Sequence, residues 1–196
     1  MKETTFKINL RYLRSDTIRK YGIYKFKYVF IGFLRNRTFR PIITMRLCQA
    51  TQNYSFRLIH LFFRQLHAWA CNKAGIDLQW PTKIGPGFCI THGWGIVISG
   101  QACVGKNVTI FHGATIGQRD KLDNKGNRFS EFPIIEDEVW IGPNSTVIGG
   151  ITIGRGSRLA AGCFVFESIP PYSTVVGNPA KIVRENCQPD VYNPAP

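Results

Sequence analysis

Acidic side chains are scarce in the first 75 residues of this chain. Glu3 and Asp16 are the only carboxylates there, against 15 lysines and arginines, whereas ten basic residues balance ten acidic ones from residue 76 onward. The whole formal charge of +13 therefore arises in the N-terminal segment. This charge favours an anionic partner, such as a membrane surface, a nucleic acid or an acidic polysaccharide. A solvated basic face on a helical cap would need no partner at all.

Long apolar runs are also absent. The most apolar run, residues 28–34, is bounded by Lys27 and Arg35 and is far shorter than the roughly 20 residues that cross a bilayer. The N-terminus lacks the apolar core and cleavage site of a signal peptide, and no nucleic-acid-reading motif is present. We therefore expect a cytoplasmic protein that binds no nucleic acid. Its basic, aromatic-rich N-terminal region would suit peripheral association with the inner face of a membrane.

Cysteine pairs and histidines are few. The six cysteines form no CxxC pair and no regular framework, which favours reduced thiols. Four histidines are present: His60 and His67 in the N-terminal region, and His92 and His112 further on. Three histidine ligands and an open position would be needed for a catalytic zinc site in the later region, so we expect no metal.

A six-residue repeat dominates the rest of the chain. Between Ile135 and Val165 an aliphatic residue returns every six positions, and a small or β-branched residue follows it at i+4. The same spacing runs through Ile84–Ile96 and through Ile98–Ile116, giving thirteen hexads. A period of six fits neither a helix nor a simple strand, and predicts short flat faces separated by corners. The pattern predicts a parallel β-helix with three faces per coil, hence about four coils.

The repeat is interrupted twice. Its phase slips by two residues between Ile96 and Ile98, and a polar segment at 118–133 replaces it before Ile135. A solenoid tolerates insertions at its corners, so we expect an extruded loop there, either functional or a floppy surface excursion. The predicted domains are a helical region at 1–75, a solenoid at 76–183 and a proline-containing tail at 184–196. An amphipathic helix is expected from Tyr54 to Ala70.

The hexads carry a family resemblance. IGPNS at 141–145, IGRGS at 153–157 and GNPAKIV at 177–183 resemble the left-handed β-helix hexapeptide acyltransferases. KIGPG at 83–87, followed by THG at 91–93, is most similar to serine acetyltransferase. The resemblance covers residues 76–183. It implies a left-handed parallel β-helix, acetyl-CoA as co-substrate, and a homotrimer or a dimer of trimers.

The resemblance also assigns a catalytic pair. Acyl transfer to a hydroxyl needs a general base that titrates near neutral pH, and histidine suits this role. His92 stands where serine acetyltransferases keep their catalytic histidine, and Asp77 matches the aspartate that pairs with it. The pair would act as a dyad in which the carboxylate orients the imidazole. Taken singly, His92 could be a corner residue and Asp77 a capping carboxylate.

The acceptor site departs from the family pattern. The aspartate that precedes the catalytic histidine is Thr91 here, and the arginine–histidine pair of the loop is replaced by Glu131 and Phe132. A zwitterionic amino acid would lose its counter-charges, so these changes favour a sugar or polysaccharide hydroxyl, as in capsule and exopolysaccharide O-acetyltransferases. Trp94 and Phe132 would stack on the sugar, and His112 would line the cleft. Serine O-acetylation and a non-catalytic scaffold are the alternatives.

The donor site is assigned from the later coils. In the family, acetyl-CoA lies in a groove between subunits, along small residues and near a basic side chain. Small residues let a ligand approach the backbone, and a guanidinium suits phosphate. Any one of the glycines could equally be a corner residue of the solenoid. The expected cofactor-binding residues are Gly117, Gly142, Pro143, Arg158, Ala160, Ala161 and Lys181.

Overall fold

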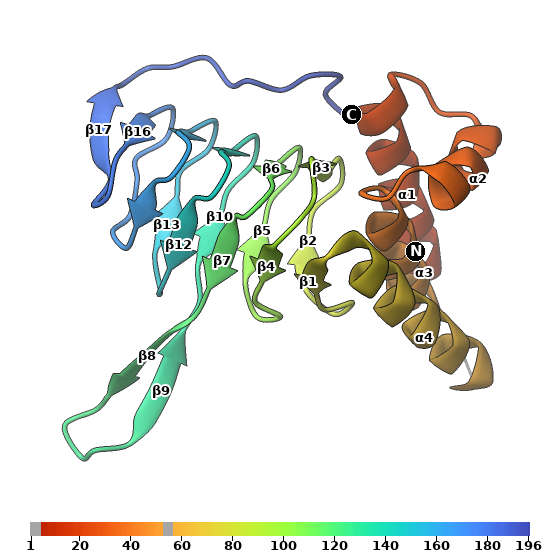
Figure 1. Cartoon of the computed structure of the whole chain (residues 1–196), viewed down its shortest axis with the longest axis horizontal. Helices are drawn as coiled ribbons and strands as arrows, with labels where there is room; N and C mark the ends of the chain where they lie inside the picture. Colours follow the sequence, from red (N-terminus) through yellow and green to blue (C-terminus); the bar gives the residue numbers. More distant parts are fainter. Residues whose placement is uncertain (1–4, 53–56) are drawn as a thin grey trace.

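The computed structural model describes residues 5–52 and 57–196 and shows a helical cap joined to a β-solenoid (Figure 1). Four helices form the cap: α1 (Thr5–Tyr21), α2 (Phe26–Arg35), α3 (Arg40–Thr51) and α4 (Arg57–Ala74). The expected helix from Tyr54 is present from Arg57, while residues 53–56 lie outside the described part. None of these helices is both long and apolar enough to cross a bilayer.

Three parallel sheets form the faces of the solenoid. The first sheet contains β1 (Ile76–Leu78), β4 (Ile96–Ile98), β7 (Thr115–Gly117), β12 (Thr146–Ile148) and β15 (Phe164–Val165). The second contains β2 (Lys83–Ile84), β5 (Cys103–Val104), β10 (Ile134–Ile135) and β13 (Thr152–Ile153). The third contains β3 (Cys89–Thr91), β6 (Thr109–Phe111), β11 (Trp140–Ile141), β14 (Arg158–Leu159), β16 (Thr174–Val176) and the antiparallel β17 (Lys181–Arg184).

The hexad side chains form the core of this prism. Ile141, Val147, Ile153 and Leu159 are fully buried, and the i+4 residue Cys163 is 1 % exposed. Each coil thus sends two residues per face inward, as the repeat predicts, and the β-helix fold class is confirmed. The expected four coils are too few, because β1 and β16 extend the stack at its two ends to about five coils.

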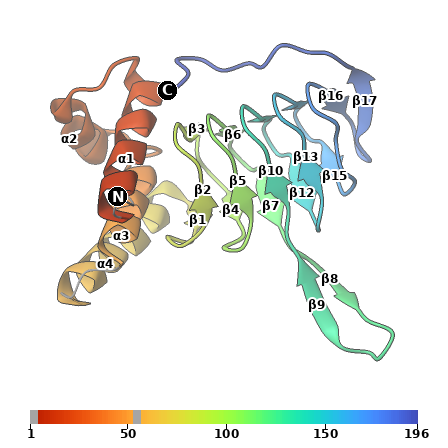
Figure 2. The same ribbon diagram turned by 180° about the vertical axis from the view of Figure 1, so that it is seen from behind.

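Two excursions leave the coils. The polar segment forms an antiparallel hairpin of β8 (Arg119–Leu122) and β9 (Arg128–Glu131), which projects from the solenoid (Figure 1). It is therefore a regular hairpin. The C-terminal tail runs back along the coils to the cap (Figures 1 and 2). Its end is held by Asn107, whose side chain donates to the Ala195 carbonyl at 3.1 Å and accepts from the Ala195 amide at 3.0 Å.

One buried arginine joins the cap to the solenoid. Arg46 of α3 donates to the Asp16 carboxylate at 2.8 Å, and to the carbonyl oxygens of Ile84 at 2.8 Å and Gly85 at 2.7 Å. Asp16 also accepts hydrogen bonds from the amides of Gly87 and Phe88. Both charged side chains are almost completely buried, and their hydrogen bonds offset the cost of removing them from water. This network places the first coil against the helices.

Candidate functional site

One edge of the prism gathers the predicted base and three of the predicted donor residues, Pro143, Ala160 and Ala161. Strands β3, β6, β11 and β14 of the third sheet are each followed by a corner that leads into the first sheet. Backbone hydrogen bonds stack these corners: Gly113 N to Trp94 O at 2.7 Å, Asn144 N to His112 O at 2.9 Å, and Gly162 N to Pro143 O at 2.8 Å. With coils about 4.8 Å apart, this edge extends about 14 Å from the His92 corner to the Ala161 corner.

His92 lies on an enlarged corner at the first-coil end of this edge. Ile90 pairs with Ile110, and Ile98 pairs with Ile116, so eight residues span the first corner where six span the next. The phase slip in the repeat is this two-residue insertion. His92 adopts a left-handed backbone conformation with φ of 54°, and its side chain is exposed. The break in the six-residue repeat therefore coincides with the corner that carries His92.

A second histidine lies beside His92. The centroid of the His112 ring is 6.5 Å from that of His92, and the Phe111 ring is 6.4 Å from His92. His112 is half-buried, and its Nδ1 atom is buried without a hydrogen-bond partner in the described structure. A buried polar atom without a partner is costly, so this nitrogen marks His112 as a residue that packing alone does not satisfy. His112 thus lies next to the expected base, and its role in acceptor binding stays a prediction.

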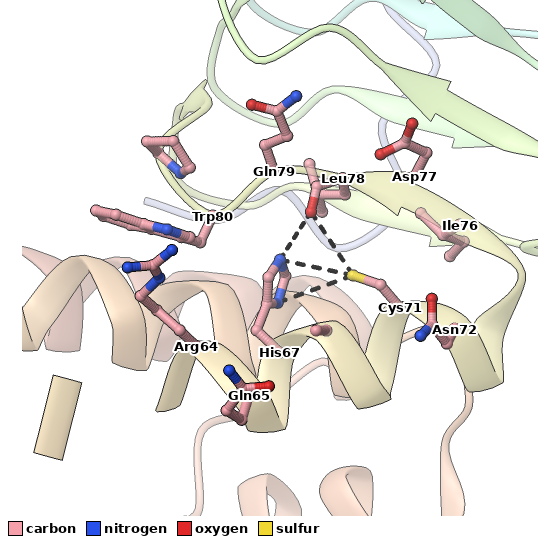
Figure 3. Close-up of a pocket in the computed structure, with 12 residues that line it drawn as sticks. Arg64, Gln65, His67, Cys71, Asn72, Ile76, Asp77, Leu78, Gln79 and Trp80 are labelled. Atoms are coloured by element: carbon pink, nitrogen blue, oxygen red, sulfur yellow. Dashed lines mark hydrogen bonds between the residues drawn. The ribbon is translucent and has the colours of Figure 1, made fainter. Parts of the chain in front are cut away.

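Asp77 lies near the same end of the edge but does not contact His92. It occupies an outward position of β1 and pairs with Val97 of β4. Strand β4 is the one that follows the His92 corner. No hydrogen bond joins its carboxylate to His92 in the described structure. Asp77 instead lines a cavity of about 470 Å³ between α4 and β1, together with Asn72 and Gln79 (Figure 3). The Asp77 and His92 dyad stays a prediction.

The floor of that cavity is a structural hydrogen-bond cluster. His67 is buried, its Nδ1 lies 2.9 Å from Thr44 Oγ1 and its Nε2 lies 2.8 Å from the Leu78 carbonyl oxygen. Burial lowers the pKa of His67 and raises the pKa of the neighbouring Cys71 thiol to about 12. The imidazole is therefore neutral and the thiol protonated at neutral pH. Both groups hold α4 against β1 (Figure 3).

The predicted acceptor residues are divided between the edge and the hairpin. Thr91 lines a cavity of about 260 Å³ beside Phe111. Trp94 packs against Gly75, and the Arg37 guanidinium lies 4.0 Å from its ring centroid. Glu131 lies on β9, where Lys121 pairs with it at 2.9 Å. The adjacent Phe132 is half-buried. Within one chain the structure does not bring the hairpin residues to His92.

The predicted donor residues differ in their surroundings. Pro143, Ala160 and Ala161 lie on the edge, and Gly117 ends β7 nearby in the first sheet. Gly142 is buried, and a Cβ atom added there would lie 2.7 Å from the Leu159 carbonyl oxygen, so packing of the next coil requires this glycine.

The two predicted phosphate partners lie off the edge. Arg158 extends over the third sheet, where it stacks 4.3 Å from the Trp140 ring centroid and pairs with Asp190 of the tail at 2.9 Å. Lys181 is exposed at the last coil and lines a cavity of about 430 Å³. Lys181 is thus free to meet a ligand phosphate, whereas Arg158 already has a carboxylate partner.

Two further residues of interest were missed from the sequence. Gly162 has φ of 72° and open space where a Cβ atom would lie, so a ligand can approach the backbone there. Arg119 lies at the base of the hairpin, 3.7 Å from Glu131, and its Nε is buried without a partner in the described structure. It packs against Gly149, which is 30 positions away in the sequence. No local sequence signal marks either residue.

Comparisons with known proteins identify similar transferases. Residues 132–167 match the family described as bacterial transferase hexapeptide (six repeats). Over 113 residues the chain is 44 % identical to a serine acetyltransferase of Bacillus licheniformis, covering 57 % of this chain and 50 % of that protein. The match to serine acetyltransferase 2 of Arabidopsis thaliana is 40 % over 110 residues, covering 56 % and 32 %. This chain spans half or less of these relatives.

Solved structures show the same likeness over more of the chain. The serine acetyltransferase of Neisseria gonorrhoeae superposes with a TM-score of 0.70 at 26 % identity, covering 93 % of this chain and 68 % of that one. That of Brucella abortus strain S19 in complex with coenzyme A gives 0.69 at 26 %, covering 93 % and 68 %. The solenoid is thus similar to hexapeptide-repeat transferases and to serine acetyltransferases.

The prediction of a sugar or polysaccharide acceptor is wrong, and so is the assignment to the capsule and exopolysaccharide type. These relatives and structures are named serine acetyltransferases. The structure shows two weaknesses in the prediction. Trp94 is 58 % exposed, but part of its ring packs against Gly75 and the Arg37 guanidinium. The exchange of an arginine for Glu131 does not leave the hairpin without cations, because Arg119 and Lys121 lie beside Glu131.

Proposed function

We propose that this protein is an acetyl-CoA-dependent serine O-acetyltransferase. The observation that carries the proposal is the edge on which an exposed His92 is followed, in successive coils, by His112, Pro143 and Ala161. A base at one end and small residues along the rest provide a reacting centre and a track for an extended thioester. The similarity to serine acetyltransferases supports serine as the acceptor, and the similar structure with bound coenzyme A supports acetyl-CoA as the donor.

His92 acts as the general base in the proposed mechanism. It takes the proton of the serine hydroxyl while the oxygen attacks the thioester carbonyl carbon of acetyl-CoA. The carbon–sulfur bond then breaks, and the departing thiolate receives that proton from the imidazolium, which leaves O-acetylserine and coenzyme A. Asp77 stabilises the imidazolium, and a backbone amide of the edge stabilises the oxyanion. Because Asp77 does not contact His92 in the isolated chain, this role requires a side-chain rearrangement.

Serine also needs counter-charges for its carboxylate and its ammonium group. Arg119 is suited to the carboxylate, because a guanidinium matches carboxylate geometry and its contact with Glu131 is long, at 3.7 Å. Glu131, 3.7 Å away, is suited to the ammonium group. The hairpin projects from its own coils (Figure 1), so we propose a homotrimer in which it reaches the edge of a neighbouring protomer.

The decisive experiment measures thiol release from acetyl-CoA with L-serine, D-serine, L-threonine and L-homoserine as acceptors. We expect turnover with L-serine, and a drop of about 10²–10⁴-fold in kcat for His92→Ala with an unchanged circular dichroism spectrum. Full activity of His92→Ala would overturn the base assignment. Arg119→Gln should raise the KM for serine more than it lowers kcat, while Arg128→Gln at the exposed hairpin tip serves as the matched control.

A non-catalytic scaffold is the rival hypothesis. Titration calorimetry with acetyl-CoA separates the two, because a scaffold binds none. If acetyl-CoA binds but none of the four acceptors is acetylated, the proposed donor site would be supported and serine would be refuted as the acceptor.

A further inference from the structure

Helix α2 presents an apolar stripe that no described part of the chain covers. Phe26, Phe30 and Leu34 follow one another at intervals of four and are 77 %, 61 % and 54 % exposed. The opposite face of the helix carries Gly32, which is buried against Phe39. Val29 and Phe33 pack against the core, so the helix has a packed face and, in Phe26, Phe30 and Leu34, an exposed apolar one, which is unusual for a helix that only supports a fold.

Cations frame this stripe. Lys25 and Lys27 precede and begin the helix, Arg35 ends it, and all three are exposed. The sequence contains no aspartate or glutamate between Asp16 and Asp77, so no carboxylate of this part of the chain neutralises them. An apolar stripe with a cationic border is the arrangement of a helix that lies in the headgroup region of a bilayer.

The position of α2 leaves this face accessible. In both views α2 lies at the outer end of the cap, on the side away from the coils and the hairpin (Figures 1 and 2). The edge with His92 and the projecting hairpin lie on the solenoid. A flat surface could therefore contact α2 without covering the candidate active site.

We propose that the stripe formed by Phe26, Phe30 and Leu34 docks the protein peripherally on an anionic lipid bilayer. Charge decides between the candidate occupants. A second copy of the chain would bring the same cationic border against itself, which is unfavourable, whereas anionic headgroups neutralise it. The phenyl and leucyl side chains enter the boundary of the acyl chains, and the lysine and arginine heads remain among the phosphates.

Sedimentation with vesicles tests the proposal on the full chain. We expect binding to vesicles of phosphatidylcholine mixed with phosphatidylglycerol, little binding to phosphatidylcholine alone, and weaker binding as salt rises because salt screens the charges. Replacing Lys27 or Arg35 by glutamine should weaken partitioning about fivefold each. Phe26→Ser with Phe30→Ser should abolish it.

The matched control is Leu122→Ser on the hairpin, which removes an apolar side chain that is 69 % exposed at a distant place. It should leave binding unchanged, and all variants should keep the wild-type melting temperature. Equal sedimentation with both vesicle types, or retained binding of the double phenylalanine variant, would overturn the proposal. It would also be overturned if that variant lost only a self-association seen by light scattering, because the stripe would then be an interface between copies. The double phenylalanine variant should still transfer acetyl groups in solution, because α2 lies away from the candidate active site. Loss of vesicle binding with retained transfer therefore tests docking separately from the proposed enzymatic function.

Discussion

The solenoid and the cap differ in net charge and in how far some of their apolar side chains are exposed. In the solenoid the hexad residues Ile141, Val147 and Ile153 have no exposed surface, and basic and acidic residues are balanced. In the cap, Phe26 and Leu58 are 77 % and 80 % exposed, and the segment carries the entire net charge. The cap also buries Phe39 and Ile42 in the common core, so the two regions differ in net charge and in the outward apolar face of α2.

The join between the two regions gives the largest predicted effect. Arg46→Met removes the cation that neutralises the buried Asp16 carboxylate, and we expect a loss of about 4 kcal/mol in unfolding free energy. Urea unfolding followed by circular dichroism measures it. The double variant Asp16→Asn with Arg46→Met should recover part of the loss, because no uncompensated charge is then buried. If both variants lose the same amount, the hydrogen bonds to Ile84 and Gly85 matter more than the ion pair.

The next largest predicted effect is the difference in unfolding free energy between a buried and an exposed position of the solenoid. Ile141→Ala empties a fully buried position and should cost about 3 kcal/mol in unfolding free energy. Ile134→Ala, at a neighbouring strand but 49 % exposed, should cost less than about 0.5 kcal/mol. Denaturant unfolding compares the two. Similar losses would mean that Ile134 is buried against another protomer, which would itself support the proposed trimer.

The smallest effect concerns pH and the contact between α4 and β1. Burial lowers the pKa of His67, so the unfolded chain binds a proton that the folded chain does not. Stability is therefore fully present above the unfolded pKa of about 6.5 and falls as pH drops below it, by at most about 1.4 kcal/mol per pH unit. Melting temperatures between pH 8 and pH 5 should show this decline in the wild type. A His67→Gln variant with the same decline would show that another group is responsible.

Much of the fold could be predicted because the solenoid repeats. Each hexad places its residues by the same local rule, so Ile135 and Cys163 were assignable to the core without knowledge of their partners. The phase slip before Ile98 coincides with the enlarged corner that carries His92. The acceptor prediction failed because Glu131 was judged by its own charge. Its neighbours Arg119 and Lys121 come from the opposite strand of the hairpin, and only strand pairing reveals them.

The sequence by itself determined the β-helix, the inward residues of its coils and the concentration of positive charge in the first 75 residues. These follow from periodicity and composition, which are local properties. Only the tertiary structure decided that Arg46 joins the cap to the first coil, that Arg158 is already paired with the tail, and that the apolar stripe of α2 faces outward. Each of these depends on which distant segments meet, because contacts between elements far apart in the chain leave no repeating signal in the sequence.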